Sequence, residues 1–218
     1  MPLWHSWHTC NDAFVYSWLI SEDESYFLYH LQDAPLDWHY LNNIRNKEKR
    51  LEWLASRLLL WQKSNAIPYK DEYGKPFVIG AERNAISITH TRHLVAIIIS
   101  NHACGIDAEW VDSRARKIMN KFMTPNELHQ FQMADDTHIS ALWSIKEAVY
   151  KLNGKPNIIF KENIEVEHFT IKENKATCQG RMDNARIGLF LPFSAEICLL
   201  DEPMYNKKYI IVTVENVV

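Results

Sequence analysis

The sequence predicts an α+β fold, in which helices interleave with antiparallel strands. Between residues 51 and 58, apolar side chains recur at positions i, i+3, i+4 and i+7, which indicates a helix with one buried face. Short apolar runs at 85–88 and 94–100 are separated by a turn, as in two neighbouring strands. With 218 residues, of which 47% are hydrophobic and 12% aromatic, the chain can form a substantial core in one domain or two halves of roughly 100 residues each.

The first half of the chain contains strands and one long helical stretch. Residues 14–20 and 26–29 are predicted to form strands or short helices, and 37–63 is predicted to be helical overall. The stretch 65–80 contains two Pro and two Gly residues, so we expect a turn-rich connection there.

The second half begins with a short predicted strand at 104–109. A helical stretch from about 113 to 133 is interrupted at Thr124–Pro125, where Thr is a favourable N-cap and Pro a favourable first residue of a helix. A second helix is expected from about 137 to 152, ending at Asn153–Gly154. The remainder alternates polar and apolar residues around turns, which is typical of strands.

Composition excludes several classes of protein. Few Gly and Pro residues argue against a disordered chain, and a net charge of −3 argues against general nucleic-acid binding. The four cysteines are scattered without a C-x-x-C pair, so we expect reduced thiols rather than a zinc or disulfide framework. The longest aliphatic run, 94–99, is too short to cross a bilayer, and no signal-peptide pattern is present. We therefore expect a cytoplasmic protein without a membrane or nucleic-acid partner.

Two carboxylates are the first candidates for chemistry. Asp107 and Glu109 are two residues apart in a predicted strand, so both side chains leave on one face. At about 4 Å their repulsion amounts to about 4 kcal/mol with an effective dielectric of 20. A divalent cation such as magnesium would relieve that repulsion. The alternative is a pair of solvated acids at the end of a strand.

The predicted helix 137–152 adds Glu147 and Lys151, which project together because they are four residues apart. They are either a surface ion pair or a metal-binding carboxylate beside an ammonium group that meets a phosphate. Further basic groups stand at turns and helix edges, where a local anion site can form: Arg50, Arg57, Lys75 and His90.

Together these segments resemble the 4′-phosphopantetheinyl transferases. Their signature motifs, G-[IV]-D-x-E and W-x-x-K-E-[AS]-x-x-K, are similar to residues 105–109 and 143–151. Residues 72–76 and 87–91 resemble two further elements of the larger, surfactin-synthetase-type branch, with Thr89 and Thr91 in place of serines. The resemblance runs from about residue 50 to 156.

The resemblance implies a pseudo-dimer of two similar α+β halves, residues 1–103 and 104–218, with coenzyme A in the cleft between them. Such enzymes move the phosphopantetheine arm of coenzyme A to a serine of an apo acyl or peptidyl carrier protein and release adenosine 3′,5′-bisphosphate. The length fits the branch that is monomeric. Neither the carrier nor its pathway (fatty acid, polyketide or non-ribosomal peptide) follows from the sequence.

The resemblance also implies roles for individual residues. Magnesium would be held by Asp107, Glu109 and Glu147, and Glu147 would act as metal ligand, general base or both. Lys151 would stabilise charge on the diphosphate, with Lys146 as a less certain neighbour. His90, Lys75 and either Arg50 or Arg57 would hold the phosphates, and the backbone at Pro76 and Thr89 would line the adenine.

For the carrier protein, the resemblance implies an acidic partner that docks on residues 114–123. Basic side chains in this stretch would supply charge, and Phe122 and Met123 an apolar anchor. Two other functions remain open: a magnesium-dependent phosphodiesterase acting on coenzyme A-like nucleotides, and a non-catalytic module that binds coenzyme A or a carrier protein.

Overall fold

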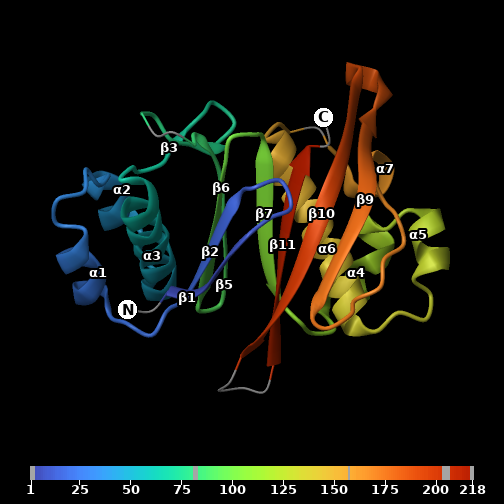
Figure 1. Ribbon diagram of the computed structural model, residues 1–218, viewed down its shortest axis with the longest axis horizontal. Coiled ribbons are helices and arrows are strands. Elements are labelled where there is room, and N and C mark those ends of the chain that lie inside the picture. Colours follow the sequence, from blue (N-terminus) through green and yellow to red (C-terminus); the bar gives the residue numbers. More distant parts are fainter. Residues whose placement is uncertain (1–2, 81–82, 157, 203–206, 217–218) are drawn as a thin grey trace. The chain divides into compact units, whose positions relative to one another are not determined.

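The computed structural model describes residues 3–80, 83–156, 158–202 and 207–216. The chain forms two compact units, Met1–Asn101 and His102–Val218, each with its own antiparallel sheet and helices (Figure 1). This arrangement confirms the predicted α+β class.

The first unit contains a sheet in the strand order β1-β2-β6-β5-β4-β3. Its elements are β1 (Leu3–His8), β2 (Phe14–Leu19), α1 (Glu24–His30), α2 (Trp38–Asn43), α3 (Lys47–Ser64), β3 (Tyr69–Lys70), β4 (Pro76–Phe77), β5 (Ala85–Thr91) and β6 (Leu94–Ser100).

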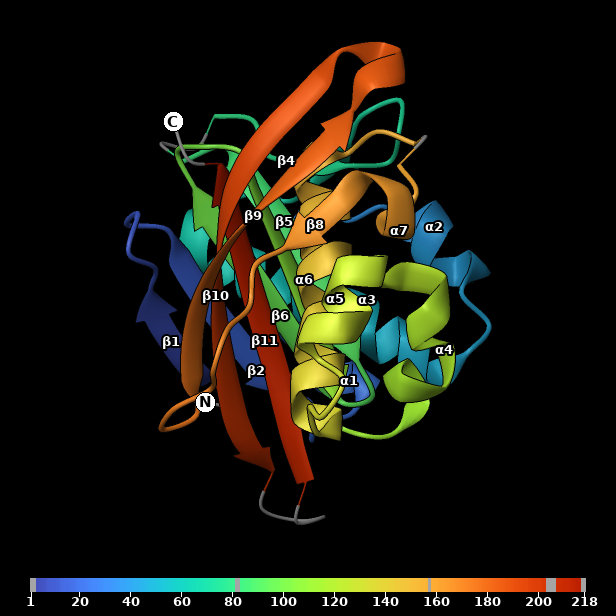
Figure 2. The ribbon, with the colours of Figure 1, turned by 90° about the vertical axis from the view of Figure 1, so that its right-hand side faces the viewer.

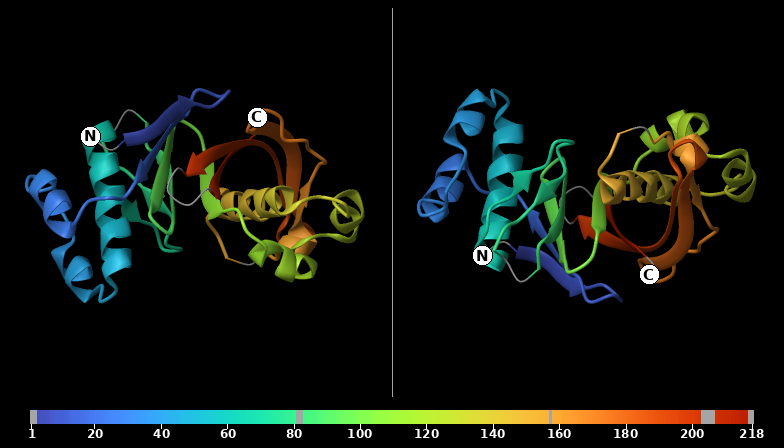
Figure 3. Two further views of the ribbon diagram at one scale, coloured as in Figure 1. Left: turned by 90° about the horizontal axis from the view of Figure 1, so that it is seen from below. Right: turned by 90° about the horizontal axis from the view of Figure 1, so that it is seen from above.

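Helix α3 organises the core of this unit. It lies along one face of the sheet, with α1 and α2 on its other side (Figure 3). The stripe predicted between 51 and 58 is present, because Leu54, Ala55 and Leu58 are buried against apolar residues of β2 and β6. Asn46 caps α3 by accepting a hydrogen bond from the Lys49 amide, and the helix ends at Asn65 in the left-handed conformation.

Two expectations for this unit need correction. The stretch 37–63 forms two helices rather than one, because Ile44 is extended and Asn46 starts a new helix. The turn-rich stretch 65–80 contains the short paired strands β3 and β4, joined by a turn in which Gly74 has a φ of 85°.

The second unit contains a sheet in the order β7-β11-β10-β9-β8. Its elements are β7 (Cys104–Trp110), α4 (Arg114–Phe122), α5 (Pro125–Gln130), α6 (Asp136–Asn153), α7 (Phe160–Asn163), β8 (Ile164–Val166), β9 (Lys175–Asn184), η1 (Ala185–Ile187), β10 (Leu189–Glu202) and β11 (Lys207–Asn216). The predicted break at Thr124–Pro125 separates α4 from α5, and Thr124 and Glu127 form a capping box.

Helix α6 is the central element of this unit. The strands curve around it, with α4 and α5 on the side away from the sheet (Figures 2 and 3). Its apolar side chains, Leu142, Ile145, Ala148, Val149 and Leu152, are buried in the core as predicted. Among the described residues, no helix is long and apolar enough to cross a membrane.

Candidate functional site

The candidate site of the second unit is built where β7 and α6 lie in close contact. Gly105 makes this contact possible, because a Cβ atom at this position would lie only 2.0 Å from the Ala148 carbonyl oxygen of α6. Strand β7 therefore approaches the helix backbone more closely than any other residue would allow. The approach brings the carboxylates of β7 next to the polar side chains of α6.

Asp107 is almost completely buried and is held by two side chains of α6. Lys151 Nζ donates a hydrogen bond to Asp107 Oδ1 at 2.7 Å, and Ser144 Oγ donates to Oδ2 at 2.9 Å. Lys151 Nζ also donates to the Ile106 carbonyl oxygen at 3.1 Å. The lysine that was expected to accompany Glu147 thus forms its ion pair with Asp107.

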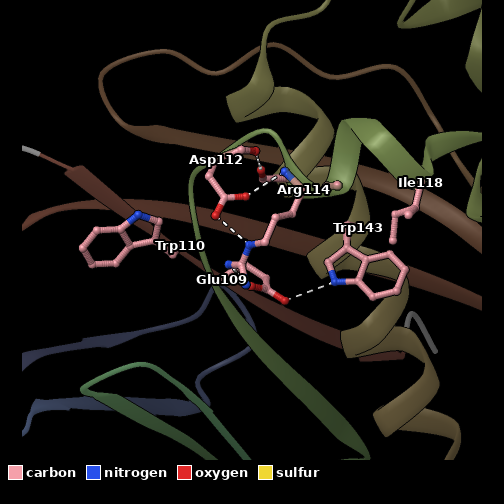
Figure 4. A pocket seen from close by; sticks show the side chains of 8 residues that line it. Glu109, Trp110, Asp112, Arg114, Ile118 and Trp143 are labelled. Atoms are coloured by element: carbon pink, nitrogen blue, oxygen red, sulfur yellow. Dashed lines mark hydrogen bonds and ion pairs between the residues drawn. The ribbon is translucent and has the colours of Figure 1, made fainter.

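Glu109 leaves β7 on the same side and is held by Trp143, whose Nε1 donates to Oε1 at 3.2 Å (Figure 4). Burial is the main factor that raises the pKa of Glu109, and the Asp107 carboxylate raises it further. Arg114 NH2 lies 3.9 Å from the second oxygen of Glu109, while its main partner is Asp112, at 2.6 Å.

Glu147 is half-buried and accepts no hydrogen bond from any residue that the structure describes. Burial raises its pKa to about 7, and the charges of Asp107 and Glu109 add to this effect, while Lys151 opposes it. A carboxyl group with this pKa can both accept and release a proton near neutral pH.

The three carboxylates have the donor chemistry that magnesium prefers, namely hard, negatively charged oxygens. Their mutual repulsion, visible in the raised pKa of Glu109 and Glu147, is the electrostatic condition that a divalent cation relieves. In the described part of the chain, however, no group of three or more His, Cys, Asp or Glu residues is arranged to hold a metal ion.

Beside Glu109 lies a cavity of about 180 Å³ that opens between β7, α4 and α6 (Figure 4). Trp110, Trp143 and Ile118 provide apolar walls, and Glu109 and Arg114 provide charge. Of the three carboxylates, Glu109 lines this cavity, which offers space for a substrate group beside it.

Lys146 does not lie with the three carboxylates of the site. Its ammonium group has no exposed surface and pairs with Glu127 at 2.7 Å, and it donates to the carbonyl oxygens of Phe122 and Ile164. The pair ties α6 to α4, α5 and β8. Lys146 therefore has no surface with which to contact coenzyme A, contrary to the expectation.

The segment 114–123, which was expected to bind the carrier protein, matches that expectation only in part. Phe122 and Met123 are each 1% exposed and belong to the core, so they cannot anchor a partner. Of the basic side chains of α4, Arg116 pairs with Asp136 at 2.5 Å, whereas Lys117 and Lys121 are exposed.

The first unit carries the basic residues. His90 is the second-last residue of β5. Its Nδ1 lies 3.1 Å from Glu52 Oε2 of α3 and 3.4 Å from Lys49 Nζ. Lys75 is half-buried in the β3–β4 turn, directly before Pro76, and Thr89 is buried in β5.

The two arginines on α3 have different surroundings. Arg50 pairs with Glu24 of α1 at 2.5 Å and also donates to the Leu41 carbonyl oxygen. Arg57 stacks on Trp53, with its guanidinium carbon 4.3 Å from the ring centre. Arg50 is therefore occupied within the fold, whereas Arg57 lies against an aromatic ring.

Two functional side chains were missed from the sequence, Trp143 and Ser144, which hold Glu109 and Asp107. The signal was available, because both precede Glu147 by one helical turn and so share its face of α6. A serine that is buried in the middle of a helix needs a hydrogen-bond partner, and Asp107 is that partner.

Comparison with known proteins bears on this second unit. Residues 103–204, which include β7 and α6, match the model of the 4′-phosphopantetheinyl transferase superfamily. The match covers a little under half of the chain, and over these residues the chain is similar to that superfamily. The 4′-phosphopantetheinyl transferase gsp of Aneurinibacillus migulanus is 38% identical over 95 residues, which are 42% of this chain and 39% of that protein. The aligned region thus spans about two fifths of the relative's length.

Within the superfamily match lie Asp107, Glu109, Glu147 and Lys151. The resemblance read from the motifs is thereby confirmed at the level of the superfamily. The basic residues of α3 and β5 and the β3–β4 turn lie outside the matched stretch.

Proposed function

We propose that this chain transfers the 4′-phosphopantetheine arm of coenzyme A to a serine hydroxyl of an apo carrier protein and releases adenosine 3′,5′-bisphosphate. The observation that carries the proposal is the contact of β7 with α6, which gathers three carboxylates and one lysine in a superfamily of such transferases. The relative's printed name, a 4′-phosphopantetheinyl transferase, supports the same reaction.

In the proposed reaction, the serine oxygen attacks the β-phosphorus of the coenzyme A diphosphate. A new P–O bond forms to serine, the bond to the oxygen of the departing adenosine bisphosphate breaks, and the serine proton must be removed. Glu147 is our candidate for accepting that proton, because its carboxyl pKa of about 7 suits proton transfer at neutral pH.

Lys151 has two tasks in this proposal. Its ammonium group holds Asp107 in place, and it can turn to the diphosphate as negative charge builds on the leaving oxygen. Ser144 and Trp143 keep the β7 carboxylates oriented. A magnesium ion held by Asp107, Glu109 and Glu147 would neutralise charge on the phosphate oxygens.

For coenzyme A, the candidates in the first unit are the side chains of Lys75, His90 and Arg57 and the backbone at Pro76 and Thr89. Of the two arginines, Arg57 is preferred because Arg50 pairs with Glu24. The carrier protein is expected to be acidic and to meet the exposed lysines of α4, Lys117 and Lys121. We expect the enzyme to act as a monomer in the cytoplasm.

The test is intact-mass spectrometry of several apo carrier proteins after incubation with this protein, coenzyme A and magnesium, with an EDTA control. We expect a mass gain of one phosphopantetheine arm that EDTA abolishes. Coenzyme A cleavage without carrier labelling would instead indicate a phosphodiesterase, and intact coenzyme A with unlabelled carriers would indicate a binding module.

Two variants test the residue roles in the same assay. Asp107→Ala should abolish transfer, whereas Asp183→Ala, an exposed carboxylate of β9, should leave it unchanged. Glu147→Gln should lower kcat by about 10²–10⁴-fold, the usual contribution of a general base. If excess magnesium restores the rate of Glu147→Gln, Glu147 is a metal ligand rather than the base.

A further inference from the structure

Helix α6 forms a fully buried ion pair that the proposed reaction does not use. The side chains of Lys146 and Glu127 have no exposed surface, and Lys146 Nζ lies 2.7 Å from Glu127 Oε2. Burial lowers the pKa of Lys146, and the negative charge of Glu127 opposes this effect. A buried ion pair loses its hydration and often adds little net stability. Stability alone therefore does not explain two charges in an otherwise apolar core.

The lysine of the pair binds the ends of two neighbouring elements. Lys146 Nζ donates hydrogen bonds at 2.8 Å to the carbonyl oxygens of Phe122, the last residue of α4, and Ile164, the first residue of β8. The last carbonyl groups of a helix have no partner within that helix. Lys146 supplies such a partner and so attaches the end of α4 to α6.

The carboxylate of the pair binds the start of the next helix. Glu127 Oε2 accepts the amide of Thr124, the N-cap of α5, at 2.7 Å, and its Oε1 accepts the Val166 amide of β8 at 2.9 Å. Through Glu127, the start of α5 and the strand β8 are held against the same lysine. Helices α4 and α5 lie together on this side of α6 (Figure 2).

This side of α6 is opposite to the one that holds the site carboxylate. Ser144 and Lys151, which both donate to Asp107, lie within about 20° of each other around the helix because they are seven residues apart. Lys146 comes two residues after Ser144, which places it about 160° away around the helix. Helix α6 is thus held from two opposite sides, by β7 at Asp107 and by α4, α5 and β8 at Lys146.

The position of α4 in turn shapes the surroundings of the site. Arg114 and Ile118 of α4 line the cavity beside Glu109, and the exposed lysines of the same helix are the proposed contacts of the carrier protein. A shift of α4 against α6 would therefore move the cavity wall and these lysines relative to Glu147.

We propose that Lys146 and Glu127 are positioning residues, whose ion pair fixes α4 against α6 and thereby aligns the carrier-facing side of α4 with Glu147. Neither residue contacts a substrate, because both side chains are fully buried. The effect on turnover rests on the proposed function, whereas the position of α4 can be measured without any substrate.

The test compares two variants of the full chain with the wild type. The double variant Lys146→Met with Glu127→Gln removes both charges together, so that no unpaired charge stays buried. Ile197→Ala shortens a buried side chain of β10, which lowers the Tm without touching the pair and provides the stability control. All activities are compared per folded molecule.

Amide hydrogen exchange in the absence of substrates reports on α4 directly. In the double variant we expect faster exchange in α4 and at the start of α5, and unchanged exchange in β7, whose contacts with Ser144 and Lys151 are retained. Exchange of α4 that is as slow as in the wild type would overturn the proposal.

Steady-state kinetics with an apo carrier protein give the second readout. In the double variant, kcat/KM for the carrier should fall by about 100-fold, the cost of misplacing a reacting group by about 1 Å, while the Kd of coenzyme A stays unchanged. Ile197→Ala should keep the wild-type kcat/KM. Equal losses in the two variants would show that the pair contributes stability alone and would overturn the proposal. If the wild type labels no carrier, the proposed function fails, and the exchange measurement still decides whether the pair fixes α4.

Discussion

At the scale of single residues, the site is defined by which carboxylates are paired. Asp107 has two donors from α6 and Glu109 has one, whereas Glu147 has no hydrogen-bond donor among the described residues. The unpaired carboxyl group is the one whose pKa rises to about 7. Hydrogen bonds favour the ionised form of a carboxyl group, so their absence leaves burial and repulsion unopposed except by Lys151.

This pKa predicts a pH dependence of stability when EDTA removes divalent cations. Folded Glu147 keeps its proton up to about pH 7, whereas the unfolded chain releases it near the ordinary value of 4.5. The resulting stabilisation is complete below about pH 4.5 and is lost as the pH rises through 7. Its upper limit is about 3 kcal/mol, and solvent screening of this half-exposed group reduces it.

Calorimetric melting between pH 5 and 8 measures the effect. The wild-type Tm should fall across this range relative to that of Glu147→Gln, which lacks the titrating group. Parallel pH profiles for the two proteins would contradict the raised pKa. Adding magnesium should shrink the difference, because a cation beside Glu147 favours the ionised form.

The sequence could predict this cluster only in part. Motif spacing places Asp107 with Glu109, and Glu147 with Lys151, because each pair lies within one element. The ion pair between Lys151 and Asp107 joins two elements and depends on how β7 packs against α6. Neither the strand pattern around Asp107 nor the helix pattern around Lys151 predicts that packing. Lys146 is a second case in which sequence patterns were not sufficient. Only the packing around α6 shows that its ammonium group forms a buried ion pair with Glu127.

At the scale of elements, the contact of β7 with α6 brings the site residues together. This contact depends on the lack of a side chain at Gly105. Gly105→Ala would place a methyl group 2.0 Å from the Ala148 carbonyl oxygen. Because that atom belongs to the helix backbone, α6 must shift away from β7. We expect a lower Tm and, in addition, a loss of activity per folded molecule as the carboxylates lose their partners.

Gly180→Ala is the matched control for this prediction. A Cβ atom at Gly180 would lie 2.3 Å from the Phe193 ring and 2.6 Å from the Glu165 carbonyl oxygen, so it also disturbs close packing in the same sheet. Its position on β9 leaves β7 untouched. At similar losses of Tm, transfer activity should survive in Gly180→Ala and not in Gly105→Ala. Equal activities would show that the β7–α6 distance does not govern the site.

Element boundaries were predictable where the cap is local. Thr124 with Pro125, and Gly154 after α6, mark helix ends that the structure reproduces. The break between α2 and α3 was missed because Asn46 caps α3 within an otherwise helical composition. The partners of Glu127, which include the Val166 amide and Lys146, come from three elements and could not be read from any one of them.

At the scale of the whole molecule, length allowed either one domain or two halves, and only the family resemblance implied two. In the structure, each of the two compact units has its own sheet and core. The proposed reaction draws on residues of both units: His90 in the first, and Lys151 with the carboxylates in the second. Binding of coenzyme A should therefore be sensitive to variants in either unit. A ligand that binds only the folded state stabilises it by about 2.7 kcal/mol at 100 times its Kd, which raises the Tm by several degrees in a chain of this length.

His90→Ala and Lys151→Ala should each reduce the coenzyme A-induced rise in Tm, whereas Lys172→Ala, an exposed lysine remote from the site residues in sequence, should preserve it. The comparison uses the rise produced by the ligand, so a change in the stability of the unliganded variant does not enter. Reduction by His90→Ala alone would mean that the first unit binds coenzyme A without the residues proposed to act on it. Reduction by both variants would support roles for both His90 and Lys151 in coenzyme A binding.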